Sequence, residues 1–214
     1  MTIDDIVSYL RTTYSPKAIL FHGSRARGDA FEQSDYDLAL ITENPAQLKP
    51  EIYQGHALDM GGISTEEMIL KAGNTPIWPC IVLFDDADHL GARLVKQTHD
   101  AFMEGPPSLT SEQRESRRVF FRRSIERIQG RGADPMARYY YLCDFYQRSL
   151  RYWCEFNQKW TLSAYRLLPL ISKEDPAYYQ MLQALWSEDY QNAVKKIFQH
   201  LFEENTHKDD EGEK

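Results

Sequence analysis

The apolar residues of the first hundred positions alternate between helical spacing and short continuous runs. Ile3, Ile6, Val7 and Leu10 are separated by three, four and seven residues, the spacing of one helix face. We therefore expect an amphipathic helix over residues 2–13. Short apolar runs that predict strands lie at residues 17–22, 36–41, 52–60 and 81–84. The third run has a glycine inside it. Another helix is expected from Ala87 to about Met103.

The pattern changes after a Gly-Pro-Pro sequence at residues 105–107, which is the strongest turn signal in the chain. A charged helical segment follows at residues 111–131. A long aromatic segment at residues 135–160 and two or three shorter helices up to Phe202 come after it, and no strand-like alternation appears. The aromatic residues are expected to be mostly helix core, with part of the stripe available to line a cleft.

These patterns predict an α+β chain in two domains. Residues 1–105 are expected to combine a mixed sheet with helices, and residues 106–205 are expected to form an all-α bundle. The polar residues 206–214 are expected to be a disordered tail.

Composition narrows the classes of function. Of the 214 residues, 42% are hydrophobic and 27% are charged, which is typical of a globular protein. The net charge of −7 argues against a dedicated nucleic-acid binder, but it leaves nucleotide binding open because a metal offsets local charge. No run approaches the length of a membrane span, and the N-terminus does not read as a secretory signal. Three widely spaced cysteines fit reduced thiols, so we expect a cytoplasmic protein.

The segment that carries chemistry is HGSRARGDAFEQSDYDLALI, at residues 22–41. A strand ends at Gly23 and Ser24, where glycine lets the backbone approach a phosphate and a helix start favours an anion. Asp35 and Asp37 are two residues apart on a strand, so both side chains leave the same face. Hard carboxylate oxygens suit Mg²⁺ together with substrate phosphates. The pattern therefore predicts metal-assisted attack on a nucleotide phosphorus.

The spacing of this segment resembles that of the nucleotidyltransferase superfamily, the fold of DNA polymerase beta. A Gly-Ser pair is followed by ten residues and then by Asp-x-Asp, and GSRARG with SDYDL is similar to the bacterial minimal and antibiotic-modifying members. The later segments IVLFDDADHL and FNQKWTLSAYRLL are more loosely similar to members with a helical substrate-binding domain.

The resemblance implies a set of site residues and ligands. Gly23, Ser24 and Arg27 would bind the nucleotide, which is expected to be ATP. Asp35 and Asp37 would hold Mg²⁺ or Mn²⁺, and Asp59 would be a third carboxylate that binds metal or acts as general base on an acceptor hydroxyl. Related enzymes often complete their sites across a dimer, so a homodimer is one expectation.

Several of these residues have an alternative structural interpretation. Asp59 also fits an acidic residue at an edge strand or turn, and Arg25 or Arg27 also fits a salt bridge. His56 is expected to be packed or at the surface, and the acids at 85–88 are expected to form a turn and a helix cap. In antibiotic-modifying relatives an acid of the second domain acts as base, which makes Asp144 and Glu155 candidates.

Three functions are compatible with these residues. The first is transfer of a nucleoside monophosphate to a hydroxyl of a small molecule, such as an aminoglycoside-like antibiotic, since an acidic aromatic cleft suits a polycation. The second is nucleotidylation of a protein, as in antitoxin-like members. The third is nucleotide binding without catalysis, a class that should tolerate loss of the third acid.

Overall fold

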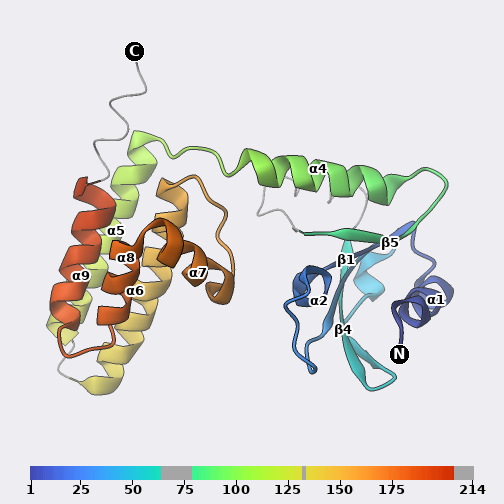
Figure 1. Cartoon of the computed structure of the whole chain (residues 1–214), viewed down its shortest axis with the longest axis horizontal. Coiled ribbons are helices and arrows are strands. Elements are labelled where there is room, and N and C mark those ends of the chain that lie inside the picture. The colour runs from blue at the N-terminus through green and yellow to red at the C-terminus, as the bar shows by residue number, and fades with distance from the viewer. Residues whose placement is uncertain (64–78, 132–133, 205–214) are drawn as a thin grey trace, which may run out of the picture. The chain divides into compact units, whose positions relative to one another are not determined.

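The computed structural model describes residues 1–63, 79–131 and 134–204, and the chain divides into two compact units (Figure 1). The first unit is Met1–Gly105 and the second is Pro106–Lys214. The tail expected at residues 206–214 lies outside the described residues. The substrate-binding role predicted for the second unit stays a prediction.

The first unit is built on a five-stranded mixed sheet with the order β3-β4-β2-β1-β5. Its strands are β1 (Ala18–His22), β2 (Tyr36–Ile41), β3 (Glu51–Tyr53), β4 (His56–Ile63) and β5 (Ile81–Asp85). All neighbouring pairs are antiparallel except β2 and β4, which run parallel. Together with the helical second unit, this sheet confirms the predicted α+β class.

Helices cover both faces of the sheet. They are α1 (Ile3–Tyr14), the five-residue α2 (Gly23–Arg27), the 3-10 turn η1 (Pro45–Gln47) and α4 (Leu90–Glu104). On one face, Ile6 and Leu10 of α1 are fully buried against apolar strand residues that include Leu38. On the other face, Leu94 of α4 packs against Ala39 and its neighbours. Because side chains alternate along β2, Asp37 projects from the same face as Ala39.

The single strand expected at residues 52–60 is a hairpin, in which β3 turns directly into β4 through Gln54 and Gly55. Both turn residues have positive φ, 48° and 81°, as a two-residue turn that matches strand twist requires. The glycine inside the predicted strand was the signal of this turn.

The helix expected from Ala87 begins at Leu90, because the acidic turn is longer than predicted. The two carboxylate oxygens of Asp85 accept hydrogen bonds from the backbone N–H groups of Gly91 and Ala92, at 2.8 and 2.9 Å. Asp85 therefore caps α4 from the end of β5, which agrees with the structural interpretation of this acidic cluster.

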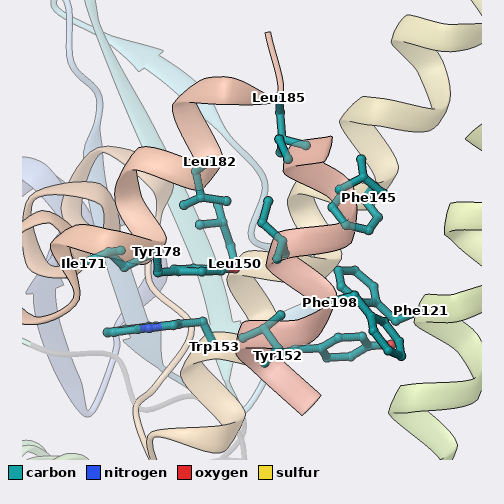
Figure 2. Close-up of a cluster of buried hydrophobic side chains, with 14 of the residues drawn as sticks. Phe121, Phe145, Leu150, Tyr152, Trp153, Ile171, Tyr178, Leu182, Leu185 and Phe198 are labelled. Carbon is teal, nitrogen blue, oxygen red and sulfur yellow. The ribbon is translucent and has the colours of Figure 1, made fainter. Parts of the chain in front are cut away.

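The second unit is a helical bundle with no strand among its described residues. Its elements are α5 (Ser111–Arg131), α6 (Pro135–Phe156), α7 (Ala164–Glu174), α8 (Pro176–Ala184), α9 (Tyr190–Gln199) and the π-helical turn η2 (His200–Glu204). Figure 2 shows Phe121, Phe145 and Phe198 meeting between α5, α6 and α9. The rings of Phe121 and Phe145 stack with their centres 4.3 Å apart. Much of the aromatic stripe is therefore core, whereas Tyr139 and Tyr140 are exposed.

Cys80, Cys143 and Cys154 are all free thiols. None of the helices in the described ranges is both long enough and apolar enough to cross a bilayer.

A partly buried carboxylate, that of Asp175 before α8, joins three elements of the bundle. It accepts hydrogen bonds from the Trp153 indole at 3.0 Å and from the backbone N–H of Tyr178 at 3.1 Å. His200 of η2 lies 2.8 Å from the same carboxylate, and its ring stacks on Tyr178. Burial raises the pKa of Asp175, but the bonds from His200, Trp153 and Tyr178 outweigh it and leave the pKa below its ordinary value.

Replacing Asp175 by alanine is therefore expected to lower the free energy of unfolding by about 2–4 kcal/mol, because a helix cap and the partner of a buried indole are lost together. Urea unfolding followed by tryptophan fluorescence measures this change. Because the folded pKa is lowered, the stabilisation by Asp175 is present above the ordinary pKa of 3.8 and is lost as the pH falls through the folded value. An alanine variant as stable as the wild-type protein at neutral pH would contradict this role.

Candidate active site

Three carboxylates meet on one face of the sheet, at the start of β2 and the middle of β4. Asp37 of β2 is the direct register partner of Asp59 of β4, because these two strands run parallel. Asp35 lies two residues before Asp37 and projects from the same face. One ligand oxygen from each of the three lies within 4.8 Å of the others. The structure thus brings together the three acids that the sequence predicted.

The electrostatics of this cluster favour a cation. Burial raises the pKa of Asp37, and the nearby charges of Asp35 and Asp59 raise it further, while His22 and Arg27 oppose the shift only in part. Three acids this close repel one another when all are ionised. A divalent cation between them would remove that repulsion and is the ligand that such an oxygen set prefers.

Gly23 packs directly against the cluster. It is the first residue of α2 and has a φ of 73°, a backbone conformation that residues with a side chain rarely adopt. A Cβ atom placed on it would lie 1.7 Å from Oδ2 of Asp37 and 2.3 Å from its Cγ. The absence of a side chain at position 23 therefore allows the backbone at the start of α2 to lie beside the carboxylates.

The loop between α2 and β2 is held by Arg25. Its guanidinium donates to the carbonyl oxygens of Ser34, at 2.7 and 2.9 Å, and of Glu32, and it stacks 4.3 Å above the Tyr36 ring. The hydroxyl of Ser34 accepts a hydrogen bond from the backbone N–H of Phe31. Arg25 and Ser34 thus brace the segment that leads into Asp35.

Residues 4–66, which contain this whole arrangement up to Asp59, match the family model described as "Polymerase beta, Nucleotidyltransferase". This match places residues 4–66 in the nucleotidyltransferase superfamily. The match ends before the helical unit. A search of curated proteins found no match.

Among solved structures, the chain is similar to a nucleotidyltransferase-like protein from Exiguobacterium sibiricum 255-15. The two sequences are 14% identical, the alignment covers 92% of this chain and 74% of the other, and the TM-score is 0.49. This likeness supports no statement about activity.

In the nucleotidyltransferase domain, the predicted nucleotide-binding residues all lie in the short helix α2. Gly23 and Ser24 open the helix, and its N-cap, His22, makes no side-chain hydrogen bond to it. The N–H groups of a first helical turn have no partner within the helix, so they can face an anion. Arg27 is the last residue of α2 and forms a salt bridge with Asp29 at 3.2 Å. A salt bridge was the structural alternative that the sequence offered for this arginine.

His22 is a neighbour of the carboxylates that the sequence interpretation passed over. It ends β1 as the register partner of Asp37. Burial lowers its pKa, and the charges of Asp37 and Asp59 offset this only in part, so the imidazole is neutral at neutral pH. Its place directly before Gly23 was the signal available in the sequence.

A small open pocket adjoins the carboxylates on the side of Asp59. It has a volume of about 380 Å³ and is lined by Asp35, Pro50, Glu51, Ile52, Ala57, Leu58 and Asp59. Ile52 pairs with Ala57 across the hairpin and is 72% exposed. The sheet order places β3 and β4 on one side of β2, and β1, which leads into α2, on the other. Asp59 therefore lies between the pocket and Asp37.

The remaining sequence candidates have structural partners. His56 sits edge-on to the Tyr36 ring at 6.0 Å, as expected for a packed residue. Asp144 pairs with Arg148 within α6, at 2.8 Å. Glu155 pairs with Arg117 at 2.9 Å and with Arg151 at 3.5 Å. Each of these acids thus holds a local ion pair within the helical unit.

Proposed function

We propose that the first unit transfers a nucleoside monophosphate from a nucleoside triphosphate such as ATP to an acceptor hydroxyl. The observation that carries the proposal is the joint placement of three carboxylates, with ligand oxygens within 4.8 Å, and a glycine whose Cβ would overlap one of them. The membership of residues 4–66 in a nucleotidyltransferase family supports nucleotide transfer in general.

Each residue has a role in this reaction. The backbone at Gly23 and Ser24 and the guanidinium of Arg27 bind the triphosphate beside Asp37. Asp35, Asp37 and Asp59 would hold Mg²⁺ or Mn²⁺, which would neutralise the phosphate charge and orient the reacting oxygens. The neutral His22 leaves the negative charge of the cluster available to a cation.

The chemical step is an in-line displacement at the α-phosphorus. A bond forms between the acceptor oxygen and the α-phosphorus while the bond from that phosphorus to the bridging oxygen breaks. Pyrophosphate leaves with the electron pair, and the acceptor proton passes to the carboxylate of Asp59. The pocket beside Asp59 gives the acceptor hydroxyl a place opposite the start of α2.

The charge of the first unit favours a cationic acceptor. Residues 1–105 contain sixteen acidic and eight basic residues, and the pocket beside Asp59 is lined by two acids of the cluster. Such a surface attracts cations and repels anions. A hydroxylated, positively charged small molecule of the aminoglycoside type fits this chemistry, and the apolar Ile52 and Ala57 would contact its ring faces.

The test is an incubation of the full chain with ATP, Mg²⁺ or Mn²⁺ and a panel of aminoglycosides, followed by mass spectrometry. The expected product is an acceptor that has gained one adenylate, with pyrophosphate released in equal amount. A label that appears on protein would favour protein nucleotidylation. Nucleotide binding detected by thermal shift, with no product from any acceptor class, would contradict catalysis.

A further inference from the structure

The helical unit carries an exposed row of cationic and aromatic side chains that the carboxylate site does not use. Helix α5 contains seven arginines, three glutamates and no lysine in its 21 residues. Along one side of it, continuing onto α6, is a row that we call the arginine–aromatic strip, which consists of Phe120, Arg123, Arg127, Arg131, Tyr141 and Tyr140.

The strip is continuous. Arg123, Arg127 and Arg131 follow one another at intervals of four residues, so they share one helix face over about 12 Å. The guanidinium carbon of Arg123 lies 5.9 Å from the centre of the Phe120 ring. At the other end, Arg131 donates to the Tyr141 hydroxyl at 3.2 Å, and the Tyr141 ring meets that of Tyr140 edge-on at 5.4 Å.

Apart from the half-buried Tyr141, the strip is open to solvent, and it is slightly hollow. Phe120 is 51% exposed and Tyr140 is 71% exposed, although large rings are normally enriched in cores or at interfaces. A shallow hollow of about 530 Å³ is lined by Arg123, Glu126, Arg127, Gly130 and Arg131. A Cβ on Gly130 would meet no atom within 4 Å, so the surface between the arginines is free for a ligand to approach. Glu126 is the one acid among these five lining residues, which leaves an excess of two positive charges.

We propose that the arginine–aromatic strip binds single-stranded nucleic acid. Guanidinium groups bind phosphates in a bidentate manner, and exposed rings stack on unpaired bases, so a row of arginines with aromatic residues at both ends matches a flexible polyanion with planar bases. An acidic peptide would satisfy the arginines but offers no bases to Phe120 and Tyr140.

The net charge of −7 does not oppose this inference, because the charge is unevenly distributed. Residues 1–105 hold an excess of eight acidic residues, whereas residues 106–214 contain seventeen basic and sixteen acidic residues. The net charge of the whole chain argued against a nucleic-acid partner in the sequence. Phosphate binding depends instead on the local cation density, which is highest on α5. The inference is independent of the function proposed for the first unit.

The test measures binding of the full chain to a fluorescein-labelled single-stranded RNA oligonucleotide of mixed sequence, by anisotropy over a range of salt concentrations. We expect the variant Arg123→Gln/Arg127→Gln/Arg131→Gln to bind at least about tenfold more weakly. The slope of log affinity against log salt should fall by about 2, because each phosphate contact to a single strand contributes about 0.7. The matched control Lys173→Gln/Lys195→Gln/Lys196→Gln removes three exposed charges from the same unit and should change affinity less than twofold.

Two further single variants test stacking without changing charge. Phe120→Ala and Tyr140→Ala should each weaken binding about fivefold or more, with the salt slope unchanged. All of these side chains are exposed, so melting temperatures should stay at the wild-type value. The proposal is overturned if the wild-type chain does not bind the oligonucleotide, if the lysine control loses as much affinity as the arginine variant, or if poly-glutamate competes as well as RNA does.

Discussion

Replacing Asp35 and Asp37 together by asparagine is expected to reduce nucleotide transfer by about 10³-fold or more. Residues that only orient metal ligands typically change affinity or activity by 10- to 100-fold, so the loss of two of the three clustered carboxylates should cost more. Asparagine keeps the size of the side chain but removes the charge that would hold a divalent cation. The rate of pyrophosphate release with the best acceptor measures the loss.

The same double variant should fold normally. Because burial and the neighbouring carboxylates raise the pKa of Asp37, its ionised form is less favourable in the folded than in the unfolded state. Removing that charge should leave the midpoint of thermal unfolding in EDTA equal to or above the wild-type value. Loss of activity together with a lower midpoint would point to a structural role instead, and retained activity would remove these residues from the site.

Replacing Gly23 by alanine is expected to lower both stability and nucleotide transfer. The new Cβ would overlap the Asp37 carboxylate, and the φ of 73° is strained for any residue with a side chain. We expect a loss of about 1–3 kcal/mol in the free energy of unfolding and at least about a 100-fold loss of transfer. Urea unfolding and steady-state kinetics measure the two effects separately.

Gly55 supplies a matched control for this substitution. It lies in the β3–β4 hairpin with a φ of 81°, and a Cβ there would have no atom within 4 Å. Gly55→Ala should therefore show the cost of positive φ alone, about 1–2 kcal/mol, with transfer close to the wild-type rate. If the two variants lost activity equally, close packing of Gly23 against Asp37 would not be the cause.

The local part of the site follows from the sequence, because it depends on short-range rules. A strand that ends in Gly-Ser and a following Asp-x-Asp determine that Gly23 opens a helix and that Asp35 and Asp37 share a face. The third carboxylate depends on strand pairing. Asp59 meets Asp37 only because β4 runs parallel to β2 in one particular register, which alternation within a single strand does not specify.

Other features depend on contacts between residues that are distant in the sequence. Arg25 braces the loop through carbonyl oxygens whose positions follow from the path of that loop. Asp175 caps α8 locally, but no local pattern predicts its bonds to Trp153 and His200, which lie 22 and 25 positions away. The exposure of the arginine–aromatic strip likewise depends on packing, because Phe121 and Phe145 fill the core whereas Phe120 and Tyr140 face the solvent.

The most direct test of the carboxylate site requires no knowledge of the acceptor. Mn²⁺ binding to the full chain can be followed by electron paramagnetic resonance with a non-hydrolysable ATP analogue present, because bound Mn²⁺ loses its free-ion signal. We expect tight, nucleotide-dependent Mn²⁺ binding that weakens at least about tenfold in Asp37→Asn. Binding should be unchanged in the control Asp144→Asn, because Asp144 forms an ion pair within the helical unit. Equal Mn²⁺ binding by the wild-type chain and Asp37→Asn, or none by either, would contradict it.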